Sequence, residues 1–372
     1  MIRLATFNVE NLFDRPKIIN LEDTAKSASL LQAAAQLQAE LAKTVYDKPR
    51  IEQLLTELKD YVTVRADRGK FFKTNSTTKL KANGKDDWAG GIEFLREKFK
   101  EPQRVNTAQV IKNVDADVMC LIEVEGRQAL SDFMREYIPN TSKRLMRNML
   151  IDSPIDPRGI DIAVAWRKAG LGTIRSNAYD SRRVNNRNVS VWSRDCLEVE
   201  LSLKDNKSLW ILANHFKSKA GGATAASDDK RLAQGQRLAE ILTTRYDLTQ
   251  DLVAVMGDLN DTPDSPAIAP LYAVPNLHDV FDAAGTDPTD RYTYYFGGAP
   301  VAKRRTQIDY IFVSEPLKDA IQSVSVYRKG MTAVAKGLIP EETPFAGITG
   351  AKDAASDHAA IVVNFAGLDL PD

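Results

Sequence analysis

The sequence is poor in cysteine and histidine, and this scarcity excludes several kinds of site. Its 372 residues include two cysteines, Cys120 and Cys196, and three histidines. Two cysteines so far apart cannot build a disulfide framework or a cysteine-rich zinc site. With 43% hydrophobic and 27% charged residues, the composition is that of a globular protein with a sizeable apolar core.

Long apolar runs are absent as well. No window contains 18 consecutive apolar residues, so no transmembrane helix is expected. The N-terminal run reaches Asn8 and Glu10 too early to serve as the apolar core of a signal peptide. These absences favour a reduced, soluble, cytoplasmic protein, although a secreted protein whose signal has been removed would give the same pattern.

Neither sign of charge predominates. The chain has 50 Lys and Arg against 50 Asp and Glu, which excludes a polybasic membrane binder but leaves room for local basic patches. No G-x-G-x-x-G follows the first predicted strand and no G-x-x-x-x-G-K-[ST] occurs, so no nucleotide cofactor is expected. The absence of H-E-x-x-H and G-x-S-x-G argues against a zinc peptidase and a serine hydrolase.

Short apolar runs predict strands, and longer stretches with helical periodicity predict helices. The strands expected are 2–8, 117–123, 160–166, 197–203, 209–214, 252–256, 308–313, 321–327 and 359–365. Helices are expected over 106–114 and 229–246. Because strands outnumber helices and many neighbours lack a helical crossover, we expect an α/β fold with a mixed or largely antiparallel two-sheet sandwich and outer helices.

A segment of different texture, residues 20–100, follows the first predicted strand. Apolar residues recur at helical spacing over 30–45 and 51–58, which predicts two helices. Residues 65–91 are polar and contain glycine, with Phe71 and Phe72 as the only strong apolar pair, so irregular structure is expected there. We interpret residues 1–372 as a single domain with a mostly helical insertion at 20–100.

Polar and titratable side chains stand where the predicted strands begin or end. They are Asn8, Glu123, Asn214, His215, Asp258, Asn260, Asp309, Asp357 and His358. Each alone is more simply explained as a cap, a turn or a hydrogen-bonded core residue. Buried carboxylates and amides are costly unless they are paired or bind metal, however, so their occurrence at the ends of six strands favours one common site.

The residue types in this set suit a hard cation. One Glu, three Asp, three Asn and two His, without cysteine, match Mg²⁺ or Mn²⁺ better than structural zinc. Phosphoryl transfer requires a metal at a phosphate oxygen, a positioned water, and neutral or cationic donors for the developing charge. Carboxylates and imidazoles can meet all three requirements.

The order of these motifs resembles that of the endonuclease/exonuclease/phosphatase superfamily, which has the DNase-I-like fold. The resemblance rests on the strings Thr6-Phe-Asn-Val-Glu-Asn-Leu, Leu121-Ile-Glu-Val, Asn214-His-Phe-Lys-Ser, Gly257-Asp-Leu-Asn, Ile308-Asp-Tyr-Ile and Ser356-Asp-His. It extends over residues 3–365, the insertion excepted. It implies a four-layered α/β/β/α sandwich of two mixed, largely antiparallel sheets, and cleavage of phosphoester bonds with a divalent metal.

The resemblance also implies roles for individual residues. Asn8 and Glu123 resemble metal-site residues of the family, with Glu123 as the principal ligand and Asp357 as a further candidate. Asp258 resembles the residue that orients or deprotonates the attacking water, and Asn260 resembles the amide that orients the phosphate.

Two imidazoles complete the implied catalytic set. His358 resembles the histidine next to the scissile phosphate, with Asp309 as its carboxylate partner. His215 is similar to the second histidine of DNase I and of the phospholipase and phosphatase branches. Members that repair abasic sites generally have a tyrosine in that function, which argues against that branch.

Basic residues flank the expected catalytic loops and suggest an anionic substrate. Lys217 follows His215, Arg305 precedes Asp309, and Arg194 lies between a basic stretch and a strand. We expect these three cations to bind substrate, although Arg194 could equally form a structural pair with an aspartate. Phosphate neutralisation dominates the affinity for nucleic acid, so a nuclease acting on DNA or RNA is the first hypothesis.

Two other functions remain open. One is a phosphatase or phosphodiesterase that acts on a small or lipid-derived phosphoester, which would need similar cations. The other is a catalytically silent interaction module, against which the complete polar set argues. Because the insertion follows the loop of Asn8, we expect it near the rim of the active site, as a lid, a substrate-selecting wall or a dimer surface.

Overall fold

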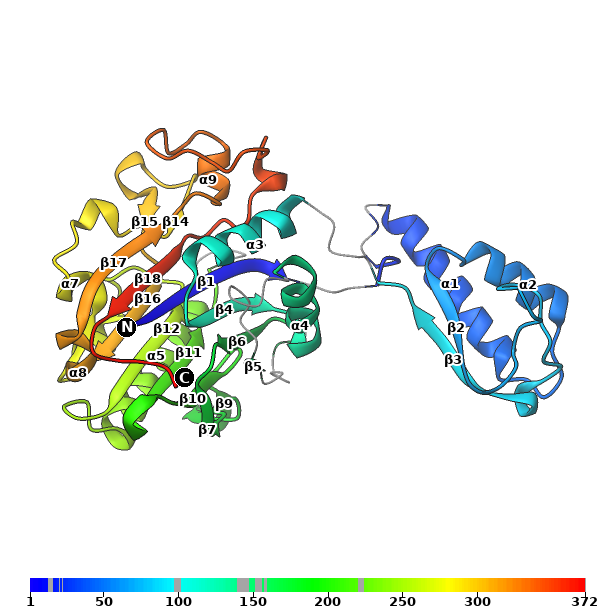
Figure 1. Ribbon diagram of the computed structural model, residues 1–372, viewed down its shortest axis with the longest axis horizontal. Coiled ribbons are helices and arrows are strands. Elements are labelled where there is room, and N and C mark those ends of the chain that lie inside the picture. Colours follow the sequence, from blue (N-terminus) through cyan, green and yellow to red (C-terminus); the bar gives the residue numbers. More distant parts are fainter. Residues whose placement is uncertain are drawn as a thin grey trace. The chain divides into compact units, whose positions relative to one another are not determined.

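The computed structural model describes residues 1–12, 16–19, 21, 23–96, 102–138, 147–150, 156, 159–219 and 224–371. It divides into two compact units, of which unit 1 comprises Met1–Phe13 and Lys100–Asp372 and unit 2 comprises Asp14–Phe99 (Figure 1). Unit 2 therefore follows strand β1 (Ile2–Leu12) in the chain. Residues 20 and 97–100, at the ends of the expected insertion, lie outside the described residues.

The first sheet of unit 1 has six strands in the order β17-β18-β1-β4-β6-β5. Besides β1 these are β4 (Val118–Val124), β5 (Arg147–Leu150), β6 (Asp161–Trp166), β17 (Ile321–Tyr327) and β18 (Ala360–Phe365). Only β1 and β4 pair in parallel within this sheet, and the other pairs described are antiparallel.

The second sheet also has six strands, in the order β13-β16-β12-β11-β10-β7. These are β7 (Gly170–Arg175), β10 (Cys196–Ser202), β11 (Ser208–His215), β12 (Leu252–Asp258), β13 (Leu277–Asp279) and β16 (Asp309–Ser314). Its single described parallel pair is β11 with β12. The predicted strands are thus confirmed, and so is the mixed, largely antiparallel arrangement.

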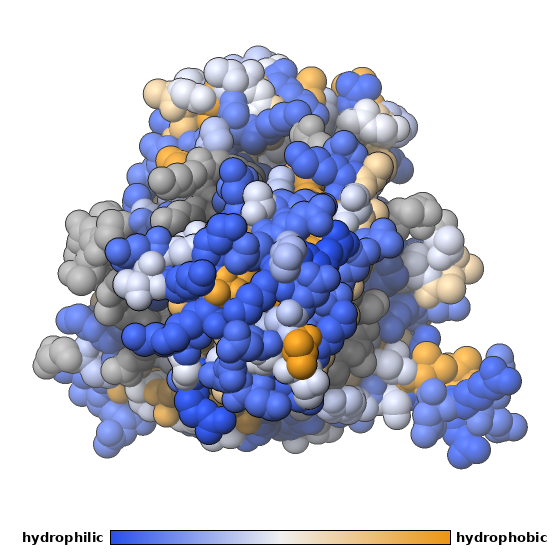
Figure 2. Space-filling view, turned by 90° about the vertical axis from the view of Figure 1, so that its right-hand side faces the viewer, coloured by the Kyte–Doolittle hydropathy of each residue, from blue (hydrophilic) through white to orange (hydrophobic). Residues whose placement is uncertain are grey.

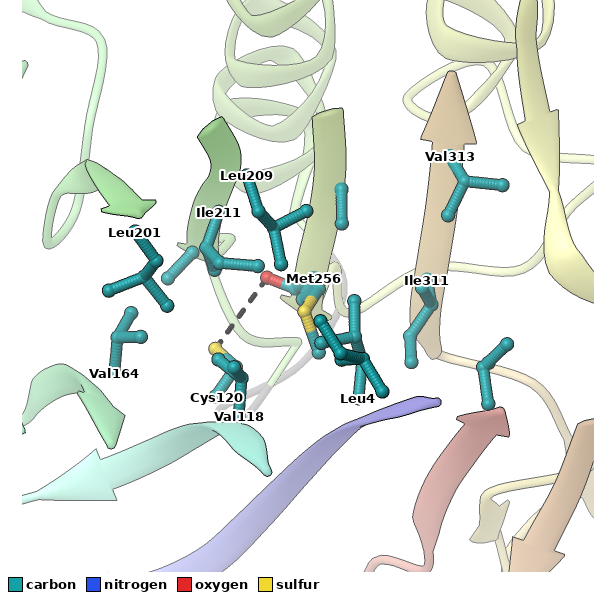
Figure 3. Packing of buried hydrophobic residues seen from close by; sticks show 14 of the residues in the cluster. Leu4, Val118, Cys120, Val164, Leu201, Leu209, Ile211, Met256, Ile311 and Val313 are labelled. Atoms are coloured by element: carbon teal, nitrogen blue, oxygen red, sulfur yellow. Dashed lines mark hydrogen bonds between the residues drawn. The ribbon is translucent and has the colours of Figure 1, made fainter. Parts of the chain in front are cut away.

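The two sheets pack face to face and enclose the core of unit 1 (Figure 3). Leu4 and Val118 of the first sheet face Ile211 and Met256 of the second, because alternate side chains of a strand point to the same face. Cys120 lies in this interface, and its Sγ donates a weak hydrogen bond to the carbonyl oxygen of Met256 at 3.7 Å.

Helices cover the outer faces of both sheets, so that unit 1 has the α/β/β/α layers that the sequence predicts. Helix α5 (Ala225–Arg245) packs Leu238, Ile241 and Leu242 against the second sheet. Helices α3 (Pro102–Val114) and α4 (Gly126–Tyr137) contact the first sheet. Helix α5 starts before the predicted residue 229 because Thr224 and Ser227 form a reciprocal capping box at its N-terminus.

The remaining elements of unit 1 are short connections. The helices among them are α6 (Ala269–Tyr272), α7 (Val280–Ala283), α8 (Glu315–Asp319) and α9 (Thr332–Ala335). The strands are β8 (Ser181–Val184) with β9 (Arg187–Ser190), and β14 (Tyr294–Tyr295) with β15 (Arg305–Thr306). None of the described helices has the length and apolarity that crossing a membrane requires.

Unit 2 contains two helices and a hairpin with a core of their own. Helices α1 (Thr24–Leu41) and α2 (Lys48–Glu57) pack against β2 (Val62–Gly69) and β3 (Trp88–Phe94). Both helices agree with the predicted periodicity. The hairpin strands occupy the two ends of the range 65–91, where irregular structure was expected, and residues 70–87 between them are largely irregular as predicted. The strands escape prediction because most of their residues are exposed and Gly90 and Gly91 interrupt the apolar alternation.

Candidate active site

The two parallel strand pairs of unit 1 end at the residues that form the candidate site. Asn8 and Glu123 lie near the carboxyl ends of β1 and β4, and His215 and Asp258 end β11 and β12 as register partners. The antiparallel neighbour β16 begins at the same edge, where Asp309 pairs with Asp258. Polar strand ends from both sheets therefore meet at one edge of the sandwich.

Gly257 allows the strands β11 and β12 to approach each other immediately before Asp258. Its φ is +142°, and a Cβ at this position would lie 1.9 Å from the carbonyl oxygen of Asn214. Only glycine fits there without displacing one of the strands.

Asp258 lies at the centre of the cluster and is buried. Its Oδ2 accepts a hydrogen bond from Asn8 Nδ2 at 3.1 Å, and it lies 3.7 Å from His215 Nε2 and 3.8 Å from His358 Nε2. Its Oδ1 accepts from the backbone N–H of Asn260 at 2.8 Å. Burial raises the pKa of Asp258, His358 lowers it and Asp309 raises it, with a result of about 7. This carboxyl group can therefore exchange a proton near neutral pH.

His358 and Asp309 form a buried pair beside Asp258. The Nδ1–H of His358 donates to Asp309 Oδ2 at 2.8 Å, and Asp309 is fully buried. Burial lowers the pKa of His358, but the negative charges of Asp309, Asp357 and Asp258 together raise it well above its ordinary value. The imidazole is therefore cationic at neutral pH.

The open side of the cluster is acidic. Glu123 Oε1 lies 3.9 Å from His215 Nε2, Asp357 Oδ1 lies 3.8 Å from His358 Nε2, and both carboxylates are partly exposed. Glu10 joins them, since burial and the charge of Asp357 raise its pKa to about 7. The negative charges of these carboxyl groups repel one another, because the three side chains lie close together.

This donor set fits a divalent cation. Carboxylate and amide oxygens are the ligands that Mg²⁺ and Mn²⁺ prefer, and a bound cation would neutralise the mutual repulsion of Glu10, Glu123 and Asp357. Asp258, Asp309 and His358 offer ligand atoms within 4.8 Å of one another. Because His358 and Asp309 are already hydrogen-bonded to each other, however, we regard the side of Glu123 as the better cation site.

Sequence reasoning missed two residues next to the cluster. Glu10 was available from its spacing of two residues after Asn8, since such residues share one face of a strand. The ring of Tyr294 lies with its centroid 5.0 Å from that of His358. Burial, followed by the charge of Asp357, raises the pKa of this phenol to about 12. Tyr294 belongs to a run rich in aromatic residues, 292–296, and no pattern in the sequence distinguishes it.

The three cations expected to bind substrate have different surroundings. Arg194 is buried, and its Nε lies 3.0 Å from Asp156 Oδ2, so it makes the structural pair that the sequence left as an alternative. Arg305 is partly exposed, pairs with Glu341 at 2.5 Å and stacks over Tyr292. The Nζ of Lys217 donates to the carbonyl oxygen of Ser218 at 3.2 Å.

Helix α5 supports the loops that carry the catalytic candidates. The Oε1 of Gln234 accepts from the backbone N–H of Lys217 at 2.9 Å, and Arg231 Nη1 donates to the carbonyl oxygen of the same residue at 3.1 Å. Arg231 Nε also donates to Asp261 Oδ2 at 2.9 Å. One fully buried guanidinium thus joins the loop after His215 to the loop after Asp258.

Comparison with known proteins gives one family match. A family model described as the endonuclease/exonuclease/phosphatase family matches residues 79–282. This range includes Glu123, His215 and Asp258, while Asn8 and His358 lie outside it. No curated protein matches the chain.

Several solved structures are similar to this chain at low sequence identity. Truncated TDP2 from Caenorhabditis elegans is 18% identical with a TM-score of 0.47, and the match covers 71% of this chain and 89% of that one. An endonuclease/exonuclease/phosphatase family protein from Leptotrichia buccalis is 15% identical with a TM-score of 0.48, over 72% and 94% of the two chains. The corresponding protein from Bacteroides vulgatus is 16% identical with a TM-score of 0.48, over 73% and 91%.

Proposed function

The chain belongs to the endonuclease/exonuclease/phosphatase family, and we propose that it is a divalent-metal-dependent phosphodiesterase that cleaves nucleic acid. The observation that carries this proposal is the convergence on Asp258, whose Oδ2 lies 3.1 Å from Asn8 Nδ2 and 3.7–3.8 Å from the Nε2 atoms of two histidines. A carboxylate, an amide and imidazoles around one point supply the groups that phosphoryl transfer needs.

Glu123, with Asn8 and Asp357, would hold Mg²⁺ or Mn²⁺ at the open side of the cluster. When bound, such a cation neutralises phosphate charge and polarises the bond to phosphorus. The residues themselves bring the phosphate within reach of Asp258 and His358.

Asp258 acts on the attacking water in this proposal. Its Oδ2 accepts the proton as the water oxygen bonds to phosphorus, the P–O bond to the leaving oxygen breaks, and that oxygen departs with the electron pair and takes a proton from solvent. The pKa of Asp258, about 7, suits a general base at neutral pH. The hydrogen bond from Asn8 and that from the backbone of Asn260 fix the orientation of the carboxylate before substrate arrives. The side chain of Asn260 orients the phosphate.

His358 and His215 stabilise the charge that develops on the phosphate oxygens. His358 is cationic and is held in orientation by Asp309, so its Nε2–H points a fixed positive charge toward the reacting group. His215, at the end of β11 in the second sheet, provides the second imidazole. Arg194 maintains the loop through Asp156 in this proposal, and Lys217 and Arg305 contact the substrate outside the cluster.

The test is cleavage of supercoiled plasmid in Mg²⁺ or in Mn²⁺, beside an EDTA control. Wild-type protein should nick the plasmid, and Asp258→Asn and His358→Ala should each abolish nicking without loss of the folded state by circular dichroism. His278→Ala is the matched control, because this histidine pairs with Glu315 away from the cluster and should retain activity.

Three results would count against the proposal. Nicking in the presence of EDTA would show that the reaction needs no divalent metal. Nicking by Asp258→Asn would show that Asp258 is not the general base. Hydrolysis of bis-p-nitrophenyl phosphate with no cleavage of plasmid or RNA would replace nucleic acid by a small phosphodiester.

A further inference from the structure

The loop between the strands of unit 2 carries a concentration of positive charge that the chain as a whole does not have. Residues 68–85, which comprise the last two residues of β2 and most of the connection to β3, contain six cations and no acidic residue, namely Arg68, Lys70, Lys73, Lys79, Lys81 and Lys85. All six are exposed. Since the full chain has equal numbers of basic and acidic residues, this segment, here called the basic loop, is a local departure from neutrality.

The basic loop keeps its like charges close together. Phe72 and Leu80 form an antiparallel bridge, the backbone N–H of Lys73 donates to the carbonyl oxygen of Lys79 at 2.9 Å, and that of Lys81 donates to Phe71 at 2.8 Å. The lysines of the two arms therefore stand side by side, where they repel one another in the absence of an anion.

Few acidic groups compensate this charge. Lys79 pairs with Glu52 of α2 at 2.8 Å, but the other five cations form no ion pair within the described part of the chain. Asp86 and Asp87 follow the loop, and the Asp87 carboxylate accepts hydrogen bonds from Asn83. The surplus is therefore available to an external anion.

The loop is anchored and presents further phosphate-binding groups. The ring of Phe71 is buried against Trp88 with centroids 4.4 Å apart, which fixes the loop on the core of unit 2. Its tip, residues 74–78, consists entirely of Thr, Asn and Ser, whose side chains are common donors to phosphate and sugar oxygens. Phe72 is half-buried between Lys70 and Lys73, where a base could stack on it.

Apolar contact does not characterise this part of the molecule. Hydrophilic residues cover most of the surface of unit 2 that is turned toward the viewer in Figure 2. An apolar protein partner would need a contiguous hydrophobic patch, whereas nucleic acid binds to clustered cations that replace the counterions condensed on its phosphates.

We propose that the basic loop of unit 2 binds the sugar–phosphate backbone of nucleic acid, through residues other than those of the catalytic cluster of unit 1. The proposal rests on the proposed function for the choice of nucleic acid as the anion. Unit 2 then raises affinity for the polymer, while unit 1 performs the chemistry.

The test measures binding without cleavage in the full chain. Fluorescence anisotropy of a labelled single-stranded oligonucleotide in EDTA, with Asp258→Asn as the parent, gives Kd at several salt concentrations. Lys70→Gln, Lys73→Gln and Lys81→Gln are combined in one variant. Loss of three phosphate contacts should reduce the slope of log K against log salt by about 2 and weaken binding about 100-fold at about 0.1 M salt.

Control variants separate this loop from overall charge. Lys26→Gln, Lys59→Gln and Lys207→Gln together remove the same charge from exposed positions elsewhere and should leave Kd within about twofold of the parent. Arginine at the three loop positions should preserve binding, because it keeps the charge. Equal binding by the loop variant and its parent would overturn the proposal.

Two further outcomes separate this proposal from the proposed function. Binding that depends on the loop, in a chain that cleaves no nucleic acid, supports the basic loop and refutes the nuclease. Plasmid cleavage with binding unaffected by the loop substitutions supports the nuclease and overturns the basic loop. Tighter binding to vesicles containing phosphatidylserine than to the oligonucleotide would also overturn it, in favour of a membrane surface.

Discussion

Replacing Arg231 by leucine should weaken both the stability and the catalysis of unit 1. Arg231 is fully buried, and its guanidinium bonds Asp261, the carbonyl oxygen of Lys217, and Asp228. Leucine keeps an apolar stem but leaves Asp261 without the partner at its Oδ2 and leaves the Lys217 carbonyl group without its donor. The loops after His215 and Asp258 then lose one of the groups that join them.

The size of the effect follows from the burial of each partner. Removing one member of a buried ion pair costs about 3–5 kcal/mol. The side chain of Asp228 is 57% exposed, so its pair adds only about 0–1 kcal/mol. Lys219 still contacts Asp261 Oδ1 at 2.5 Å, which favours the lower end of the range. We expect a loss of about 3 kcal/mol in the free energy of unfolding, or a fall in Tm of about 6–12 °C for a domain of this size.

Catalysis should fall further than stability explains. At temperatures where Arg231→Leu is fully folded, displacement of His215 and Asn260 should lower kcat by about 10²-fold with a smaller change in KM. Urea unfolding followed by circular dichroism gives the stability, and initial rates of phosphodiester hydrolysis give kcat and KM. Arg231→Lys should recover part of the stability, since it retains the charge near Asp261.

Arg237→Leu is the matched control on the same helix. Arg237 pairs with Asp180 and Glu240 and is partly exposed, so its loss should cost at most about 1 kcal/mol and leave kcat unchanged. Wild-type kcat in folded Arg231→Leu would refute the positioning role. An equal loss of kcat in Arg237→Leu would attribute the effect to general weakening of α5.

Three other predictions concern single buried groups. Asp309→Asn removes the charge that keeps the neighbouring imidazole cationic, so kcat should fall about 10²–10³-fold in steady-state assays, and an unchanged kcat would contradict this. Burial raises the pKa of Cys120 to about 12 and that of Cys196 well above its ordinary value, so both thiols stay neutral at pH 8. Ellman's reagent should therefore modify the two cysteines only after unfolding. Rapid labelling of the native protein would be evidence against their burial. Gly257→Ala places a Cβ 1.9 Å from Asn214 O and should cost more than about 2 kcal/mol in urea unfolding, an expectation that a wild-type midpoint would defeat.

The sandwich of unit 1 could be predicted because its strands have strong local signals. Buried strands such as β4 and β12 are short runs of apolar residues bounded by a polar group. Both the run and the polar residue can be recognised in the sequence without knowing which strands lie next to them. The hairpin of unit 2 was missed for the opposite reason. Only one of its faces is buried, and Gly90 and Gly91 contribute no side chain to the pattern.

Most residues of the candidate cluster could be named from the sequence, whereas their geometry could not. Asn8 and Asp258 could be named from their positions at strand ends, but the hydrogen bond between them joins residues 250 positions apart. The pair of Arg194 with Asp156 likewise depends on tertiary structure, which is why the sequence offered both a structural and a substrate-binding role. Tyr294 lies against His358 and pairs with it in an isolated β-bridge, which no local sequence pattern predicts.

The pairing of β1 with β18 brings an early and a late strand of the chain together, which has a consequence for the proposed nuclease during its synthesis. The strand β18 comes last among those described, and His358 stands two positions before its first residue. The ribosome therefore incorporates Asn8, Glu123 and Asp258 into the chain well before it adds His358. Until then the nascent chain, which is surrounded by ribosomal and messenger RNA, lacks the cationic imidazole of the proposed nuclease. Under the proposed function, nuclease activity therefore begins only after β18 has been made.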